Sequence, residues 1–116
     1  EKRGTQMKSF YGGIFMKKEN LEEAGIPYPI KLEYYKIIEE KNYRENYGIE
    51  VIKTEYRNEQ ICVENKTLYD VANDEEKVDD FLNLLKENEV TPITVDYILE
   101  DWINVNKTLE KKWNIV

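Results

Sequence analysis

Short polar connections join the segments of alternating hydrophobicity, and this feature constrains the fold of this chain more than any other. Residues 30–39 and 47–54 place apolar side chains at alternating positions, which is the pattern of a half-buried strand. The polar residues 41–46 separate these two segments, and residues 57–60 separate the second from a third. Parallel strands need a connection of roughly a dozen or more residues. The sequence therefore predicts an antiparallel sheet of consecutive strands.

The ends of this predicted sheet are less regular than its centre. Alternation breaks in the second half of residues 30–39, which indicates a bulge or burial on both faces near Lys36. Residues 61–64 form a third predicted strand, and residues 67–71 form a short fourth strand after a polar pair. Cys62 lies within the third strand. We expect it to pack as a small apolar residue, because no cationic neighbour in the sequence would stabilise a thiolate.

Two helices are predicted after the sheet. The first covers residues 74–87, with Asn73 as the expected N-cap and acidic residues in the first turn, where the helix dipole favours them. Pro92 then interrupts the helical pattern, and the second helix begins near residues 93–94. Apolar side chains recur at helical spacing in both segments: Val78, Phe81, Leu82 and Leu85 in the first, and Val95, Ile98, Leu99, Trp102 and Ile103 in the second.

These elements predict an α+β fold, in which a three- or four-stranded antiparallel sheet is followed by two helices packed on one face. The apolar positions of the strands and helices together supply a single hydrophobic core. The predicted core consists of Leu32, Tyr34, Ile37, Ile49, Val51, Ile61, Val63, Val78, Phe81, Leu82, Leu85, Val95, Ile98, Leu99 and Trp102.

The sequence divides into three parts. Residues 1–29 are predicted to be a semi-ordered N-terminal arm with an extended Pro-containing linker, because a glycine pair interrupts any regular pattern and Pro27 and Pro29 exclude a helix. Residues 30–106 form the predicted α+β domain. Residues 107–116 are expected to be a C-terminal helical extension or an apolar tail.

Four segments carry a resemblance to a known family: residues 34–38 (YYKII), 47–51 (YGIEV), 77–85 (KVDDFLNLL) and 88–93 (NEVTPI). The last segment fits the pattern Asn-x-Val-(Ser/Thr)-Pro-(Ile/Val). Over Leu32 to Trp102 the chain resembles a small domain family of unknown function from anaerobic, spore-forming Firmicutes. The resemblance implies a domain and a lineage, and it assigns no catalytic or binding residue.

The composition excludes several kinds of chemistry. The chain has no His and one Cys, so it can build neither a Ser/His/Asp or Cys/His nucleophile nor an internal disulfide. Carboxylates are dense over residues 70–80, but they lack the spacing of a calcium-binding loop and fit a solvated helix face. We therefore expect no enzyme activity, no cofactor and no metal site. The apolar runs are far shorter than the roughly 20 residues that span a bilayer, and no signal pattern is present, so a cytoplasmic protein without membrane contact is expected.

The charge distribution argues against direct DNA binding. The second helix offers Asp96, Glu100 and Asp101 and no basic residue before Lys107, whereas phosphate contacts need Lys or Arg. The formal net charge of −7 allows a different role, in which the chain mimics nucleic acid and blocks a nucleic-acid-binding protein.

The aromatic content favours a protein-interaction role. Nine tyrosines and two tryptophans are present, and such side chains are enriched at binding surfaces. Several are predicted to lie outside the core, in loops or tails: Tyr11, Tyr28, Tyr43, Tyr56 and Trp113. These residues are the predicted partner-binding set. The sequence thus predicts a non-enzymatic cytosolic interaction or regulatory domain that binds another protein, with an acidic inhibitor or nucleic-acid mimic as the alternative and homodimerisation left open.

Overall fold

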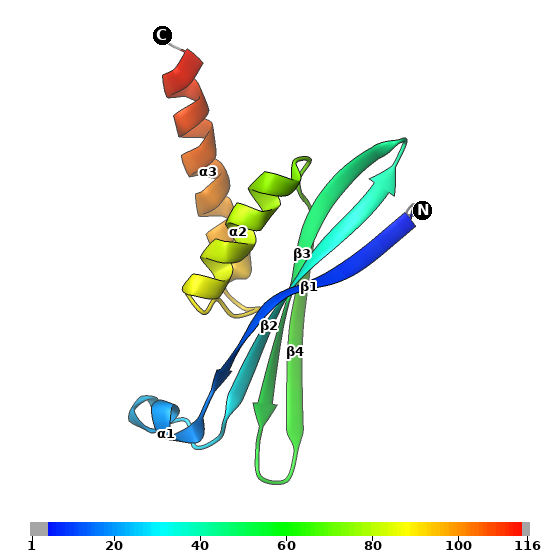
Figure 1. Cartoon of the computed structure of the whole chain (residues 1–116). Coiled ribbons are helices and arrows are strands. Elements are labelled where there is room, and N and C mark those ends of the chain that lie inside the picture. The colour runs from blue at the N-terminus through cyan, green and yellow to red at the C-terminus, as the bar shows by residue number, and fades with distance from the viewer. Residues whose placement is uncertain (1–4, 115–116) are drawn as a thin grey trace.

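The computed structural model describes residues 5–114, with side chains from residue 6 to residue 107. Its strands form one four-stranded antiparallel sheet in the order β1-β2-β3-β4 (Figure 1). The prediction of an α+β fold with an antiparallel sheet followed by helices is confirmed. The elements are β1 (Thr5–Met16), α1 (Lys18–Leu21), the 3-10 helix η1 (Glu22–Ala24), β2 (Ile30–Lys41), β3 (Arg44–Tyr56), β4 (Ile61–Ala72), α2 (Glu75–Glu87) and α3 (Val95–Asn114).

Strand β1 lies in the segment for which the sequence predicted a semi-ordered arm, so that prediction is wrong for residues 5–16. The strand pairs with β2 along its whole length, from Thr5 opposite Glu40 to Met16 opposite Ile30. The pairing register shifts between Phe10 and Gly12, where β1 has a bulge. A bulge switches the parity of the side chains that follow it, and this switch removes the alternation by which a strand is recognised in a sequence.

Strand β4 is continuous, where the sequence predicted two short strands. Asn65 and Lys66 continue the pairing with β3, opposite Ile52 and Val51. In the sequence these two polar residues resemble a turn, but an edge strand accepts them because its side chains are half exposed. The four strands of the structure are therefore not the four that alternation suggested.

Strands β2 and β3 form the centre of the sheet and pair without a register shift. No bulge lies at Lys36, and the alternation breaks there because β2 buries residues on both of its faces: Tyr34 and Ile37 are both buried. The turn that joins the strands places Asn42 and Tyr43 at φ angles of 54° and 61°. Two successive left-handed residues are typical of a type I′ hairpin turn.

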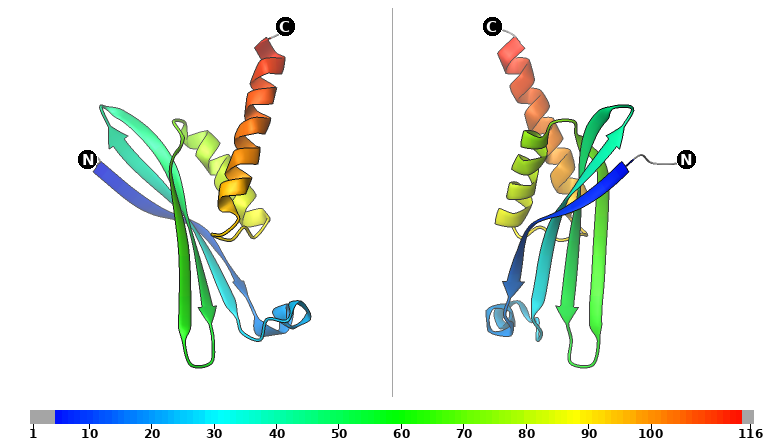
Figure 2. Two further views of the ribbon diagram at one scale, coloured as in Figure 1. Left: turned by 180° about the vertical axis from the view of Figure 1, so that it is seen from behind. Right: turned by 45° about the vertical axis from the view of Figure 1, so that its right-hand side comes forward.

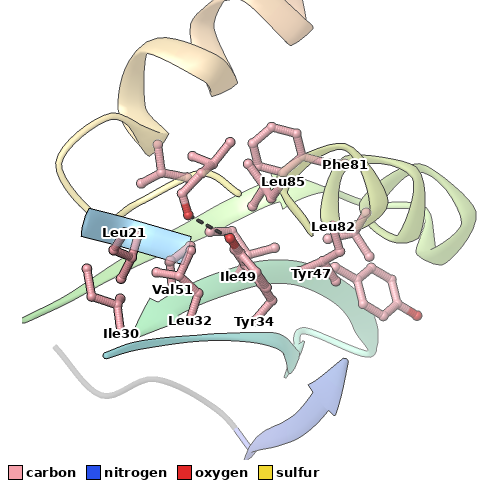
Figure 3. Close-up of a cluster of buried hydrophobic side chains, with 13 residues drawn as sticks. Leu21, Ile30, Leu32, Tyr34, Tyr47, Ile49, Val51, Phe81, Leu82 and Leu85 are labelled. Atoms are coloured by element: carbon pink, nitrogen blue, oxygen red, sulfur yellow. Dashed lines mark hydrogen bonds between the residues drawn. The ribbon is translucent and has the colours of Figure 1, made fainter. Parts of the chain in front are cut away.

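The core lies between the sheet and α2. Ile49 and Val51 of β3 belong to this core together with Phe81 and Leu82 of α2, and none of these side chains is exposed (Figure 3). The Tyr34 hydroxyl donates a hydrogen bond of 2.8 Å to the carbonyl oxygen of Val90, which ties β2 to the segment between the helices. Ten of the predicted core residues are buried and three are partly buried against the core: Leu32, Tyr34, Ile37, Ile49, Val51, Val78, Phe81, Leu82, Leu85 and Val95, then Ile98, Leu99 and Trp102.

Ile61 and Val63 are the two predicted core residues that the structure places elsewhere. Their exposed fractions are 62% and 61%. Both lie on β4, with side chains on the sheet face opposite α2. Apolar character alone does not reveal which face of a sheet is covered, and this explains the error.

Helix α2 is capped by Asp74 and not by Asn73. The Asp74 carboxylate accepts a hydrogen bond of 3.1 Å from the backbone N–H of Glu76. Helix α3 contacts α2 and β4 through its first turns and then extends beyond the sheet (Figure 1). No helix within the described part of the chain is long and apolar enough to cross a membrane.

Candidate interaction surface

The sheet has two faces of different character. The helix face carries Ile30, Leu32 and Tyr34 of β2, which belong to the buried core (Figure 3). The opposite face, here called the open face, has no helix over it within residues 5–114 (Figure 1). The strand pairings place on the open face the side chains of Lys8, Phe10, Phe15, Tyr35, Ile37, Glu50, Ile52, Tyr56, Ile61, Val63, Asn65, Thr67 and Tyr69.

Aromatic pairs form two contacts on the open face. Phe10 of β1 meets Tyr35 of β2 edge to face, with ring centroids 5.5 Å apart. Phe15 meets Tyr56 of β3 at 6.1 Å. Phe10 and Phe15 nevertheless remain 59% and 55% exposed. Together with Ile61 and Val63, they give the open face apolar side chains at both edges of the sheet, the kind of patch that marks binding surfaces.

A polar network lies between these apolar groups. The Lys8 ammonium lies 2.9 Å from one Glu50 carboxylate oxygen, and the Asn65 amide donates to the other oxygen at 2.9 Å. Lys8 also lies 4.9 Å from the centroid of the Tyr35 ring. Burial opposes the ionisation of Glu50, but the hydrogen bonds from Asn65 and Lys8 outweigh it and lower the Glu50 pKa. The network thus holds a charged carboxylate in place across three strands.

The open face is hollowed beside this network. The hollow has a volume of about 290 Å³. Its walls come from β1, β2, β3 and β4, and they include the Lys8–Glu50 ion pair and the buried Ile37. The surface therefore combines exposed apolar side chains with a fixed polar centre, which is the composition expected of a specific protein-binding surface.

A second concave surface lies between α2 and α3. This groove has a volume of about 400 Å³ and is mainly apolar. The rings of Phe81 and Trp102 lie 4.9 Å apart and join the two helices. The groove is lined by Leu84, Asn88, Val90, Ile98, Asp101, Trp102 and Val105. Of its apolar residues, Ile98 and Trp102 belong to the helical stripe that the sequence assigned to the core, whereas Leu84, Val90 and Val105 do not.

The structure does not bring together the four predicted partner-binding residues whose side chains it describes. Tyr11 lies at the β1 bulge, where its hydroxyl is 3.5 Å from the Asp79 carbonyl oxygen of α2. Tyr28 is half-buried before β2 and contacts the Arg57 guanidinium. Tyr43 is fully exposed at the β2–β3 turn.

Of the four predicted residues whose side chains the structure describes, only Tyr56 lies on the open face. Tyr56 is there, packed on Phe15, whereas the side chain of Trp113 lies outside the described residues. The structure adds Phe10 and Phe15 to the site. The sequence analysis had placed both residues in the N-terminal arm. Recognising them requires the pairing of β1 with β2.

A lysine of β2 contacts the acidic cluster of residues 70–80. Lys36 of β2 lies 2.8 Å from a Glu75 oxygen and 2.7 Å from an Asp79 oxygen, so a lysine neutralises part of the cluster. Burial alone would lower the pKa of Lys36, but its hydrogen bonds to Asp79 and Glu75 raise it. Among the described residues, no group of three or more Cys, Asp or Glu side chains could hold a metal ion.

Comparison with known proteins identifies a family for the chain. The model of a family described as a family of unknown function, DUF6514, matches residues 13–105. The match supports the resemblance to a small domain of unknown function and extends it at both ends, into β1 and further along α3. No curated protein and no solved structure matches the chain.

Proposed function

Because the chain belongs to the DUF6514 family of unknown function, we propose its function from its surface: a non-enzymatic, cytosolic interaction or regulatory domain that binds another protein through the open face. The observation that carries this proposal is the gathering of Phe10, Phe15, Ile61 and Val63 on one face, each more than half exposed. Exposed apolar side chains cost solubility, and a partner that buries them gains binding energy. The origin in anaerobic, spore-forming Firmicutes remains a prediction of the resemblance.

The proposal requires that both helices stay on the helix face, so that the open face is free. Its apolar groups supply contact area, while the Lys8–Glu50–Asn65 network supplies directional hydrogen bonds. A binding surface of this kind sits on a rigid sheet and needs no rearrangement of the domain. The alternative, an acidic inhibitor that mimics nucleic acid, would instead use exposed carboxylates of α2, such as those of Glu76 and Asp80.

The experiment compares two variants of the full chain as baits in native extract. Phe10→Ser combined with Phe15→Ser removes aromatic groups from the open face, and Ile93→Ser is the matched control because Ile93 is 69% exposed between the helices. We expect one partner protein to bind the wild type and the control and to lose most of its binding to the double variant. The purified partner is then used to measure the dissociation constants.

Ionic strength separates the proposal from its alternative. Binding through apolar contacts should change little between low and moderate salt, whereas binding through carboxylates should weaken steeply. A partner that salt releases and that binds the double variant normally would replace the proposal with the acidic inhibitor. Hydrolysis of a generic ester, phosphate or nucleic-acid substrate, lost on mutation of a carboxylate, would contradict both.

A further inference from the structure

The two edges of the sheet differ in how well they are protected. Strand β1, at one edge, is interrupted by its bulge between Phe10 and Gly12. Strand β4, at the other edge, pairs with β3 without interruption from Ile61 to Leu68 (Figure 2). Within residues 5–114, no strand covers the outer edge of β4. An uninterrupted edge strand without proline presents backbone donors and acceptors to another strand.

We propose that β4 pairs antiparallel with β4 of a second copy of this chain, around a two-fold axis at Asn65. This pairing places Glu64 opposite Lys66 of the second copy, and Lys66 opposite Glu64 of the second copy. Moving the axis to Glu64 would place two glutamates opposite each other, and moving it to Lys66 would oppose two lysines. Like charges in direct opposition destabilise a strand pair, so of these three registers the charges of β4 favour the one at Asn65, which alone pairs opposite charges.

The apolar residues of β4 fit the same register. On the open face, Ile61 lies opposite Tyr69 of the second copy, and Val63 lies opposite Thr67 of the second copy. On the helix face, Cys62 lies opposite Leu68 of the second copy. Ile61 and Val63, which are 62% and 61% exposed in the single chain, each gain a cross-strand neighbour. The exposed apolar groups of the edge thus become internal to a continuous sheet.

The two charged side chains can accept these new neighbours. The Glu64 carboxylate is 44% exposed and its contact with Lys53 is 4.0 Å, at the outer limit of an ion pair. The Lys66 ammonium is 43% exposed and lies 3.4 Å from the Asp96 carboxylate of α3. Partly exposed charges of this kind retain enough freedom to form a second contact.

The dimer would join two four-stranded sheets and place the two open faces side by side. The inference is independent of the proposed function, because its test measures the association of the purified chain with itself.

A single chain also has more surface than a compact monomer of its size. Its accessible area is 8292 Å², compared with about 6,700 Å² expected from its mass.

The first test measures the dimer dissociation constant of the full chain by sedimentation equilibrium. Glu64→Lys and Lys66→Glu each place like charges opposite each other twice per dimer, and we expect each to weaken the dimer about tenfold or more. The controls Asp80→Lys and Lys86→Glu make the same charge changes on α2 and should leave the constant within about twofold. The double variant Glu64→Lys/Lys66→Glu, and an equimolar mixture of the two single variants, should both restore the dimer.

The second test reports the register directly. In a Cys62→Ser background, Asn65→Cys places two thiols opposite each other at the two-fold axis, within the distance that a disulfide needs. We expect a disulfide-linked dimer under mild oxidation, and none from Glu59→Cys in the same background. A wild type that is monomeric at all concentrations, charge variants that associate like the wild type, or no selective cross-link at residue 65 would each overturn the proposal.

Discussion

Phe81 shows how much of the stability depends on single core positions. Its ring is not exposed at all, lies 4.9 Å from the Trp102 ring of α3 and belongs to the buried core. We expect Phe81→Ala to lower the free energy of unfolding by about 3–5 kcal/mol, because it removes buried apolar area and leaves a cavity. Chemical denaturation measures the change. Ile93→Ala, at a largely exposed position, is the control and should change stability by less than about 0.5 kcal/mol.

Glu50 links stability to pH. Its pKa is lowered in the folded state, because hydrogen bonds from Asn65 and Lys8 outweigh its burial. A lowered carboxyl pKa gives stability that is present above the ordinary pKa of glutamate and is lost as the pH falls through the folded value. We expect Glu50→Gln to be less stable than the wild type above the ordinary pKa of glutamate, with the difference shrinking as the pH falls below that value. Thermal unfolding of both proteins across this pH range tests the prediction. A stability difference that does not change with pH would contradict it.

At the scale of the element, the cap of α2 is a local test of the structure. Asp74→Ala removes the acceptor for the Glu76 N–H and should cost about 0.5–2 kcal/mol. Asn73→Ala is the matched control one residue earlier, and it should cost less than about 0.5 kcal/mol. Urea unfolding of the two variants measures the loss of stability in each. The opposite order of the two costs would show that α2 begins at the residue predicted from the sequence.

The elements differ in how far the sequence could predict them. Helix α2 was predictable because its buried residues, from Val78 to Leu85, follow one helical stripe with no competing pattern. Strand β1 was not, because its bulge hides the alternation and Gly12 imitates a loop. The residues of the candidate site also differ in how far the sequence could predict them. Tyr56 was predicted to lie in a loop after strand 47–54 and to bind a partner, whereas Phe10 becomes a site residue only through the pairing of β1 with β2.

At the scale of the whole molecule, the chain is elongated. Its principal extents are 53 × 37 × 21 Å, and its radius of gyration is 16.6 Å, compared with about 13 Å for a compact domain of this length. The projecting α3 contributes to this shape (Figure 1). Small-angle X-ray scattering of the monomer, at concentrations that prevent self-association, should give a radius close to 16.6 Å. A value of about 13 Å would mean that α3 folds back on the domain.

The strand order β1-β2-β3-β4 has a consequence for the path by which the chain folds. Every strand pairs only with its neighbours in the sequence, so each pairing closes a short loop at a small cost in chain entropy. The turn at Asn42 and Tyr43 is the shortest of these loops, and it favours β2 and β3 as the first hairpin. Strand β4 can add through residues 57–60, whereas β1 must wait for the longer segment 17–29 to close. Such local pairing has a low contact order, and we expect this sheet to fold faster than sheets of the same size that are built from distant strands.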